Sequence, residues 1–400
     1  MRNLMVVLVG VALMVGAGCS SDDGNETPVA PSIPTGLGAE GSLGRIDLAW
    51  SASTGEGLVG YNVYRSADGG AFAKINASVV TGLAYQDLAV LDGVYYSYKV
   101  TAVGDAESDY SATVRSMHGT RLERAYDAGC ELAAGALNPY VAEDSVTVAG
   151  GNLTIYPSAQ LYVLDNAVID MEFVWPSPVS TIVVNGLLRV VASDAAPAKF
   201  TAHKASGTAN DGEGFALLIN ELADDYDPAD GSGTLIRNCT IEYLKYSNNA
   251  IRIQGCSPRI SNCRISSSKS NGASYFEINS TGLTMDHCHV ERIVLTLYGD
   301  LTTTGLSITR NTWRNGYYSL YLSSATNRMV NVGQIANNDF GETVHGIYMH
   351  VVTGTEDVPL SNNYWGGGEL PAIIQGGGTT VTVDFAPTLA EPPADCGPTW

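Results

Sequence analysis

Basic side chains are scarce in this chain. Its 400 residues include 21 Lys and Arg against 41 Asp and Glu, which gives a formal charge of −20. Proteins that bind nucleic acid or anionic lipid present a basic face to the phosphates. The composition therefore argues against both partners, and a membrane would be reached only through a lipid anchor. The same charge repels polyuronates unless bound cations bridge the two surfaces.

Two motifs and one periodicity are also missing. The seven cysteines form no Cys-x-x-Cys pair, which argues against zinc, and no Arg-Gly-Asp supports integrin-type binding. In the second half, no ten-residue stretch keeps the 3.6-residue apolar period of a helix. Ile, Val, Thr and Tyr are frequent there instead, as they are in strands. With 44 Gly available for turns, the chain is expected to be all-β.

The second half repeats a six-residue pattern: apolar, spacer, polar, Cys or Asn, spacer, apolar. Its fourth position returns after 24, 25, 23, 27 and 25 residues. A period of this length is typical of one turn of a solenoid. The fourth position is held by Cys239, Cys263, Cys288, Asn311, Asn338 and Asn363.

Each copy also changes parity, which predicts a bend. Ile236 and Asn238 fall on one face of a strand, whereas Ile241 has the opposite parity. Asn tolerates the left-handed backbone conformation that such a bend uses. Asn side chains stacked about 4.8 Å apart on successive turns can also hydrogen-bond along the column. We therefore expect stacked bends that join short parallel strands.

A second strand follows each bend and alternates large apolar residues with outward ones. With Asn362–Asn363–Tyr364–Trp365–Gly366, these copies resemble the right-handed parallel β-helix of the pectate-lyase-like superfold. The Asn column resembles the asparagine ladder of that family. The resemblance implies a β-helix over residues 141–388, about ten turns at this repeat length, before a tail at 389–400.

Residues 1–18 have the plan of a secretory signal. An apolar run from Leu4 to Val15 is too short to span a membrane as a helix. The residues before Cys19 resemble a bacterial lipobox, although Gly16 stands where that motif usually has Leu. The resemblance implies lipidation of Cys19, and Ser20 implies export to the outer membrane or cell surface. The alternative is an ordinary signal peptide with an incidental cysteine.

Residues 19–32 form a polar linker, and the next segment carries turn signals about every ten residues. The runs 48–50, 60–66 and 96–103 resemble a fibronectin type III domain over residues 33–120. That resemblance implies a β-sandwich spacer or docking unit, with Trp50 and Tyr98 in its core. Residues 121–140 are a connector. Within it, residues 121–134 are expected to form a short amphipathic helix that caps the exposed solenoid end.

Active sites of the pectate-lyase-like superfold usually line the outer face of one sheet. The resemblance places Arg252, Glu277, Thr296, Tyr321 and Tyr348 there as stacked outward neighbours. A lyase needs a base, and a cation to hold the substrate carboxylate. Arg252 could be that cation, although a cross-strand ion pair with Glu277 is the simpler interpretation.

No complete catalytic set can be assigned. Arg252, Glu277 and His289 are the weak catalytic candidates. His289 is expected to face outward, and His287 is expected to replace a ladder Asn inside the solenoid. Polygalacturonase-like Asp clusters and the carboxylate set of calcium-dependent pectate lyases have no counterpart here. A hydrolase would need two carboxylates about 5–9 Å apart.

Tyrosines on the same sheet offer a different function. They could form a flat aromatic strip for sugar rings, because tyrosine combines an apolar ring with a polar tip. The alternative is ordinary solvent-exposed Tyr on a β-sheet. The candidate ligand-binding residues are Tyr317, Tyr318, Tyr321 and Tyr348, with His350 at the rim.

A loop at residues 224–231 has acids at calcium-ligand spacing. Asp225, Asp227 and Asp230 precede Gly231, although the loop departs from an EF-hand by one residue and lacks the closing Glu. Residues 210–213 could converge on the same edge. Calcium is therefore the one cofactor that the sequence suggests, and a solvated acidic loop is the alternative.

The cysteines of the repeat also allow two interpretations. On adjacent turns, Cys239, Cys263 and Cys288 would have Cα atoms near 5 Å apart, which is within disulfide range. Buried thiols that replace Asn in the stack are the simpler interpretation. Cys130, Cys256 and Cys396 have no partner that the sequence assigns.

Three functions remain open after these observations. The first is a monomeric, surface-anchored lipoprotein whose β-helix binds extracellular or cell-surface polysaccharide without turnover. The second is a polysaccharide lyase or glycoside hydrolase on the same scaffold. The third is a structural envelope protein that needs no site. Binding requires exposed aromatics on one sheet, whereas catalysis requires a cleft with a perturbed acid or base.

Overall fold

The protein is seen in a computed structural model that has no helix among its described residues, and so none that could cross a membrane. The predicted signal, most of the linker and Cys19 lie outside these residues. The structure describes residues 29–136, 138–173, 179–204, 213–245, 250–268, 274–279, 282–298, 305–323, 334–342, 345–350, 358–366, 370–376, 379 and 382–400.

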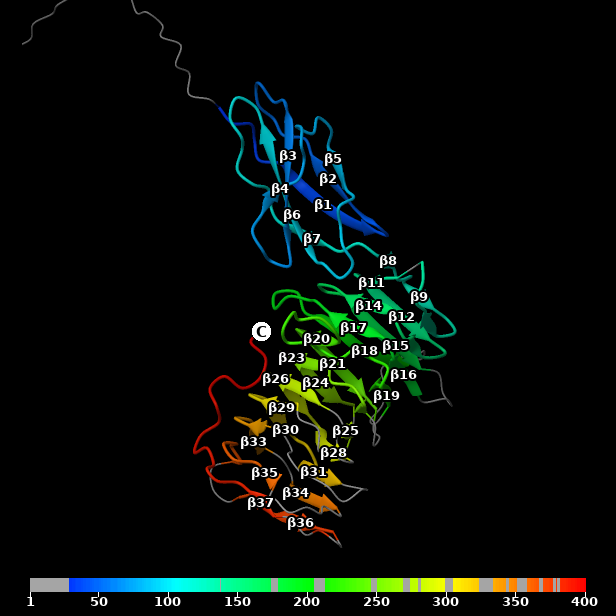
Figure 1. The fold of residues 1–400 in the computed structure, drawn as a ribbon, viewed down its shortest axis with the longest axis vertical. Coiled ribbons are helices and arrows are strands. Elements are labelled where there is room, and N and C mark those ends of the chain that lie inside the picture. Colours follow the sequence, from blue (N-terminus) through cyan, green and yellow to red (C-terminus); the bar gives the residue numbers. More distant parts are fainter. Residues whose placement is uncertain are drawn as a thin grey trace, which may run out of the picture.

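The N-terminal part is a β-sandwich of two antiparallel sheets, ordered β1-β2-β5 and β4-β3-β6-β7 (Figure 1). Trp50 and Tyr98 are buried between the sheets, as the sequence predicted, and the Tyr98 hydroxyl donates to Asp87 Oδ2 over 2.8 Å. The strands are β1 (Thr35–Ser42), β2 (Arg45–Ser51), β3 (Gly60–Ala67), β4 (Ala73–Lys74), β5 (Ala84–Asp87), β6 (Tyr96–Val103) and β7 (Val114–Ser116).

The rest of the chain is a parallel β-solenoid with three ladders, which confirms the predicted fold class. The first ladder is β8 (Thr120–Arg121), β11 (Tyr140–Ala142), β14 (Gln160–Val163), β17 (Leu187–Val190), β20 (Leu235–Arg237), β23 (Arg259–Ser261), β26 (Leu283–Asp286), β29 (Leu306–Thr309) and β32 (Gln334–Ala336). The second is β9 (Ala125–Tyr126), β12 (Ser145–Ala149), β15 (Val168–Phe173), β18 (Ala198–Lys204), β21 (Cys239–Leu244), β24 (Arg264–Ser267), β27 (His289–Glu291), β30 (Thr312–Arg314) and β33 (Asp339–Glu342).

The third ladder carries the outward residues of interest. It comprises β10 (Cys130–Leu132), β13 (Leu153–Ile155), β16 (Val179–Val184), β19 (Gly214–Ile219), β22 (Ile251–Gln254), β25 (Ser274–Asn279), β28 (Ile293–Tyr298), β31 (Tyr318–Ser323), β34 (His345–His350) and β36 (Ile373–Gln375). A last parallel pair is formed by β35 (Val358–Pro359) and β37 (Val383–Asp384). The first ladder has nine strands within the described residues, close to the ten turns expected.

The helix expected over residues 121–134 is wrong. The short strands β8, β9 and β10 lie at this end of the solenoid, and each pairs in parallel with the next turn, as Thr120 does with Tyr140 and Cys130 with Leu153. Ladder pairing satisfies the backbone groups of this segment, whereas so short a helix would be marginal in water. The first ladder therefore begins at Thr120 and not at residue 141.

The predicted bend lies between the first and second ladders. The left-handed residue is the third of each copy, one before the stacked Cys or Asn. A left-handed residue reverses the parity of the strand that follows it. The corner residues are Asn238 (φ 52°), Asn262 (φ 54°), His287 (φ 54°), Arg310 (φ 59°), Asn337 (φ 57°) and Asn362 (φ 59°).

Inside the corner, the asparagine ladder is confirmed. Asn311 Nδ2 donates to Asn338 Oδ1 over 3.0 Å, and Asn338 Nδ2 donates to Asn363 Oδ1 over 3.1 Å. All three side chains are fully buried. Each amide also donates to a carbonyl of the preceding turn, as Asn338 Nδ2 does to Ile308 O over 2.8 Å. The buried amides are therefore satisfied, and they tie three successive turns together.

Thiols continue the same column toward the N-terminus. Cys239, Cys263 and Cys288 are fully buried, and the Sγ atoms of the first two lie 3.5 Å apart. All six described cysteines are free thiols. The prediction that His287 lies inside is wrong. Cys288 takes the interior position, and the half-buried ring of His287 sits at the corner with its Nδ1 3.0 Å from Asp286 Oδ1.

The C-terminal strap, residues 387–400, runs back beside the solenoid toward its middle turns (Figure 1). It follows the corner residues of the bend and bonds to each of four turns. Its contacts are Asn362 N to Pro387 O at 2.5 Å, Cys396 Sγ to Asn337 O at 3.3 Å, Arg310 Nε to Asp395 Oδ2 at 2.7 Å, Thr399 N to Asn262 Oδ1 at 2.7 Å and Trp400 Nε1 to Asn262 O at 3.0 Å.

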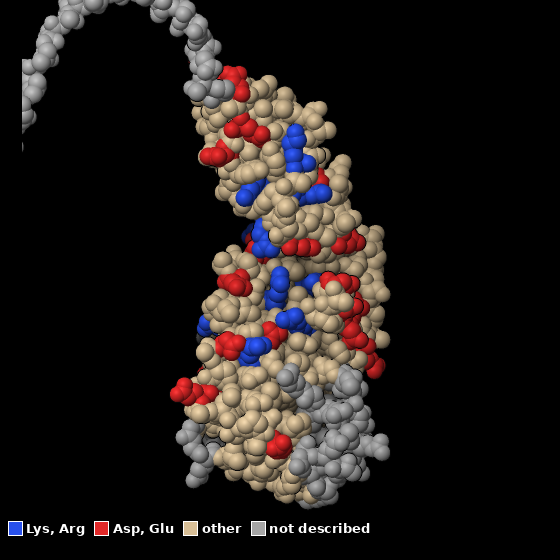
Figure 2. Space-filling model, turned by 60° about the vertical axis from the view of Figure 1, so that its left-hand side comes forward, with Lys and Arg blue, Asp and Glu red and all other residues tan. Residues whose placement is uncertain are grey.

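The sandwich packs against the outer side of the first ladder. Tyr95 and Met117 of the sandwich side share a buried apolar cluster with Val141, Tyr162 and other solenoid residues. Across the same junction, Arg115 and Asp165 form an ion pair at 3.1 Å. On the face drawn in Figure 2, acidic side chains spread from the sandwich over the upper solenoid and do not gather in one patch.

Candidate functional site

The predicted outward column of the third ladder is confirmed by the strand register. Arg252 pairs with Glu277, Glu277 with Thr296, Thr296 with Tyr321, and Tyr321 with Tyr348. Their neighbours along each strand are buried apolar residues, because strand side chains alternate between core and solvent. The five side chains therefore lie on one outer face, on successive turns.

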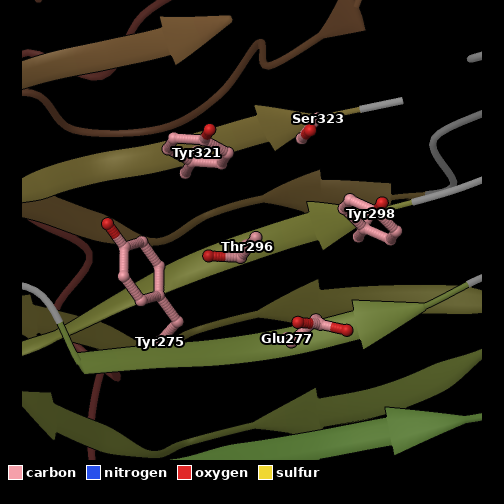
Figure 3. Close-up of a pocket in the computed structure, with 6 residues that line it drawn as sticks. All are labelled: Tyr275, Glu277, Thr296, Tyr298, Tyr321 and Ser323. Carbon is pink, nitrogen blue, oxygen red and sulfur yellow. The ribbon is translucent and has the colours of Figure 1, made fainter. Parts of the chain in front are cut away.

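The column is interrupted at Thr296. Its small side chain lies between the longer Glu277 and Tyr321 and leaves a hollow of about 180 Å³ above it. Figure 3 shows Thr296 on the strand between those that carry Glu277 and Tyr321, with Tyr275 and Tyr298 on opposite sides. The six described residues that line the hollow are Tyr275, Glu277, Thr296, Tyr298, Tyr321 and Ser323.

Aromatic rings surround this hollow and extend from it along the ladder. We use the name tyrosine face for Tyr275, Tyr298, Tyr317, Tyr318, Tyr321, Tyr348 and His350. The rings of Tyr321 and Tyr348 stack with centroids 5.0 Å apart and planes at 15°, and Tyr275 meets Tyr321 edge-on at 5.8 Å. Since Tyr348 covers one side of the Tyr321 ring, the other side faces the turn of Thr296 and the hollow.

The remaining predicted ligand residues join the tyrosine face. The Tyr318 ring lies 5.5 Å from Tyr348 and 4.8 Å from Tyr317. His350 is exposed, with its ring nearly parallel to that of Tyr348 at 6.4 Å. The geometry thus brings together all five residues that the sequence proposed for ligand binding, although whether they bind a ligand stays a prediction.

Two residues of the tyrosine face were missed from the sequence. Tyr275 stands two residues before Glu277, and Tyr298 two residues after Thr296. Strand alternation therefore puts both on the outer face. This parity is the signal in the sequence that identifies both residues as outward neighbours of the central column. Tyr298 is 37% exposed.

Glu277 is the one charged side chain among the six residues of the hollow. Its partial burial raises the pKa of the carboxyl, and the positive charge of Arg252 opposes that rise. The Arg252 guanidinium hydrogen-bonds to Gln254 Oε1 on its own strand. Arg252 is thus one turn away from Glu277, on the side opposite to Thr296 and the hollow.

His289 does not belong to this site. It lies on β27 of the second ladder, in register with Arg264 and Thr312, whereas Glu277 lies on the third ladder. Partial burial lowers the pKa of His289, and the nearby Arg314 and Arg264 lower it further, against the opposing effect of Glu291. The three weak catalytic candidates therefore do not converge: Arg252 and Glu277 are neighbours, and His289 is separate.

The proposed calcium loop makes local turns. Asp227 Oδ1 and Asp230 Oδ1 each accept the backbone N–H two residues further on, over 2.8 Å, and Asp225 Oδ1 accepts the N–H of Ser257 over 2.6 Å. Residues 210–212, expected nearby, lie outside the described residues. In the described part of the chain, no three acidic, His or Cys side chains converge as metal ligands. These carboxylates alone do not complete a calcium shell, and calcium binding stays a prediction.

Comparison with characterised proteins finds similarity over limited segments. One segment is 36% identical over 109 residues to an amylopullulanase of Thermoanaerobacterium saccharolyticum, which is 27% of this chain and 8% of that enzyme. Another match, 42% identical over 107 residues, is to the amylopullulanase of Thermoanaerobacter thermohydrosulfuricus, 26% of this chain and 7% of that enzyme. The chain thus spans less than a tenth of these relatives. No family model matches it.

Similar solved structures include an Fn3-like protein from Clostridium thermocellum, 35% identical, covering 22% of this chain and 92% of that one at a TM-score of 0.19. A pectate lyase from Erwinia chrysanthemi in complex with tetragalacturonic acid is 12% identical and covers 76% of this chain and 88% of its own, at 0.19. The exopolygalacturonase of Yersinia enterocolitica is 10% identical, covering 92% and 84%, at 0.26. Values of this size say nothing about the activity of this chain.

Proposed function

We propose that the tyrosine face binds a polysaccharide and seats one sugar ring in the hollow over Thr296. The observation that carries the proposal is the hollow itself. A small residue separates an aromatic wall, Tyr321, from a carboxylate, Glu277, on consecutive turns of a rigid ladder. Aromatic rings contribute apolar contact area, and a few polar groups fix the orientation of a ligand.

The size of the hollow supports a single ring. A volume of about 180 Å³ corresponds to about six water molecules, at roughly 30 Å³ each. It is smaller than the 300–1,000 Å³ typical of pockets that enclose whole drug-sized ligands. A longer glycan would therefore extend from the hollow over the neighbouring rings of Tyr318 and Tyr348, which lie on the same outer face.

Polar groups for orientation are also present. Tyr275, Tyr298, Ser323 and Thr296 carry hydroxyls that donate and accept hydrogen bonds, and the Glu277 carboxylate accepts them. A sugar ring presents hydroxyls at its edge and C–H groups on its faces. The Tyr321 ring can pack against the C–H faces of the sugar, and the surrounding oxygens can hydrogen-bond to the hydroxyls at its edge.

The test is to measure the affinity of the full chain for a panel of soluble polysaccharides by affinity electrophoresis and calorimetry. Tyr321→Ala should weaken binding about tenfold or more, equivalent to about 1.4 kcal/mol. Tyr156→Ala is the control, because Tyr156 is an exposed tyrosine of the solenoid that does not line the hollow. Absence of any binding contradicts the proposal and leaves a structural envelope role. Equal effects of the two substitutions contradict the hollow as the binding site.

A second candidate function is glycan cleavage with Glu277 as the acid. It is favoured by the position of Glu277 in the hollow and by the raised pKa of its carboxyl, both typical of a general acid. Hydrolysis would need a second carboxylate about 5–9.5 Å away, and the described lining supplies none. Unsaturated product absorbing at 235 nm that disappears in Arg252→Ala or Glu277→Gln would favour cleavage over binding.

The proposal includes anchoring of the chain at Cys19, in the outer membrane or at the cell surface, with the sandwich as a spacer. The support is the lipobox-like sequence and the polar linker that follows it. Cys19→Ala should move the protein from the membrane fraction to the soluble fraction. Equal partition of the two proteins contradicts the anchor and leaves the glycan site untouched.

A further inference from the structure

The charge at the hollow bears on which sugars fit. Of the six described lining residues, Glu277 alone is charged, and the other polar groups are the hydroxyls of Tyr275, Thr296, Tyr298, Tyr321 and Ser323. The nearest outward cation along the column is Arg252. It lies on the turn beyond Glu277 and is hydrogen-bonded to Gln254. A sugar ring over Thr296 therefore lies nearer to the Glu277 carboxylate than to the Arg252 guanidinium.

We propose that the hollow selects an uncharged hexopyranose and rejects a uronate, with Glu277 as the residue that discriminates. This inference rests on the proposed glycan-binding function. The Glu277 carboxylate accepts hydrogen bonds from sugar hydroxyls, and a carboxylate can accept two at once. A uronate carboxylate in the same place would meet a like charge. It could also donate no hydrogen bond to Glu277.

The expected strength of the charge repulsion supports a clear difference in affinity between a neutral sugar and a uronate. Repulsion between two like charges 4 Å apart corresponds to an affinity ratio of roughly several hundredfold at an effective dielectric constant of about 20, and of about fivefold in bulk water. Glu277 is half-buried, so the repulsion lies between these limits. Because a half-buried carboxylate lies above the lower limit of about fivefold, we expect an affinity ratio of about tenfold or more. The overall charge of the chain, −20, acts in the same direction.

The described residues that line the hollow offer no positive charge that could offset the repulsion between Glu277 and a uronate carboxylate. Tyr321 faces the ring from one side with a surface of negative quadrupole potential, which does not favour an anion. The N–H groups of β28 and β31 are engaged in the ladder. Among the described lining residues, an anion would thus be met only by hydroxyl donors.

The experiment uses the full chain at pH 7.5 and matched pairs of oligosaccharides. Each pair is an oligouronide of galacto, gluco or manno configuration and its carboxyl-reduced counterpart, so the two members differ only in the charged group. Calorimetry gives the affinity ratio. We expect the reduced member of the best-binding pair to bind at least tenfold more tightly. In Glu277→Gln the ratio should fall below about threefold because the amide carries no charge, and the reduced member should bind more weakly than it does to the wild type because one acceptor oxygen is lost.

A measurement on the unmodified chain keeps the inference testable if Glu277→Gln fails to fold. Raising NaCl from 20 to 500 mM shortens the Debye length to a few ångströms and screens repulsion. The affinity for the oligouronide should then rise while that for the reduced member stays constant. A fall in oligouronide affinity with salt would reveal attraction and overturn the inference.

The outcomes separate the two proposals. If the oligouronide binds as tightly as its reduced partner, and Tyr321→Ala removes both, the glycan site stands and the discrimination by Glu277 is wrong. If the ratio survives in Glu277→Gln, another group discriminates and the inference is overturned. If no member of any pair binds, both the inference and the proposed function fail.

Discussion

The rings of Tyr321 and Tyr348 stack across adjacent turns, with centroids 5.0 Å apart and planes at 15°. The stack fixes the orientation of Tyr321, because a ring packed face to face cannot rotate without losing that contact. Tyr348 is thus a positioning residue for the hollow, from which it is one turn removed.

Removal of the Tyr348 ring is expected to weaken glycan binding less than removal of the Tyr321 ring. Tyr348→Ala should lower the affinity about three- to tenfold, because an aromatic pair contributes about 0.5–1.5 kcal/mol. Tyr348→Phe keeps the ring and should stay within about threefold of the wild type. If Phe is as damaging as Ala, the hydroxyl binds the glycan directly and the positioning role is wrong.

The asparagine ladder is expected to set the stability of the last turns. In Asn338→Ala, Ile308 O loses its donor, and Asn311 loses the acceptor of its backbone N–H and amide. Leaving buried polar groups unpaired should cost about 3 kcal/mol in the free energy of unfolding, measured by denaturant titration. Asn337→Gly is the control, since glycine readily adopts the φ of 57° found there. Equal losses in both variants would contradict the ladder as the cause.

The C-terminal strap is expected to stabilise the solenoid. Trp400→Ala removes the indole bond to Asn262 O and the cation–π contact with Arg264, whose guanidinium carbon lies 4.8 Å from the ring centroid. The loss should be about 1–2 kcal/mol, seen as a lower melting temperature. Glu391→Ala changes an exposed residue of the same strap and should stay within about 0.5 kcal/mol. Identical melting temperatures for all three proteins would show that the strap contributes nothing.

The pH dependence of stability should reflect His203 on the second ladder. Burial lowers its pKa, but hydrogen bonds and charges from Asp170 and Glu172, 2.8 and 3.2 Å away, produce a net rise. A raised pKa in the folded state means that the stabilising contribution is complete below about pH 6.5, the unfolded value, and disappears as the pH rises through the folded value. The melting temperature of the wild type should therefore fall more between pH 6 and 8 than that of His203→Gln. Parallel profiles of melting temperature against pH for the wild type and His203→Gln would contradict this role of His203. The control is His350→Gln, which changes an exposed histidine.

Calcium binding by the 224–231 loop predicts a response to chelation. EDTA should lower the melting temperature, and Asp230→Asn should reduce that response, because a bound ion stabilises the folded state by mass action. Asp105→Asn, in the sandwich, is the control for a change of charge alone. An unchanged melting temperature on EDTA treatment would contradict calcium binding by this loop.

The sequence predicted the ladders and their register because strand alternation is strict. Once the bend was placed, Arg252, Glu277, Thr296, Tyr321 and Tyr348 had to face outward together. The sequence does not identify which residue within the bend is left-handed. That residue is the polar third residue of each copy, which includes His287 and Arg310 as well as Asn.

The hollow and the strap could not be predicted in the same way. The hollow depends on a size difference between Thr296 and its neighbours on other turns, and on Tyr275 and Tyr298 from flanking positions. The strap has no periodicity of its own, because it contacts the corners of turns that are distant in sequence. The helix predicted at residues 121–134 is wrong for a different reason. A weak local helical pattern is overridden there by ladder pairing with the next turn.

In a plain solenoid each turn contacts only its neighbours, so the free end can unravel one turn at a time. The strap changes that topology, because Thr399 and Trp400 are bonded to Asn262, more than 130 residues earlier in the chain. The final turns are thereby closed into a circuit, and the turns that carry the tyrosine face lie within it. The circuit closes only when Thr399 and Trp400 reach Asn262, so the turns that carry the tyrosine face become fixed only after a contact between residues far apart in the sequence has formed.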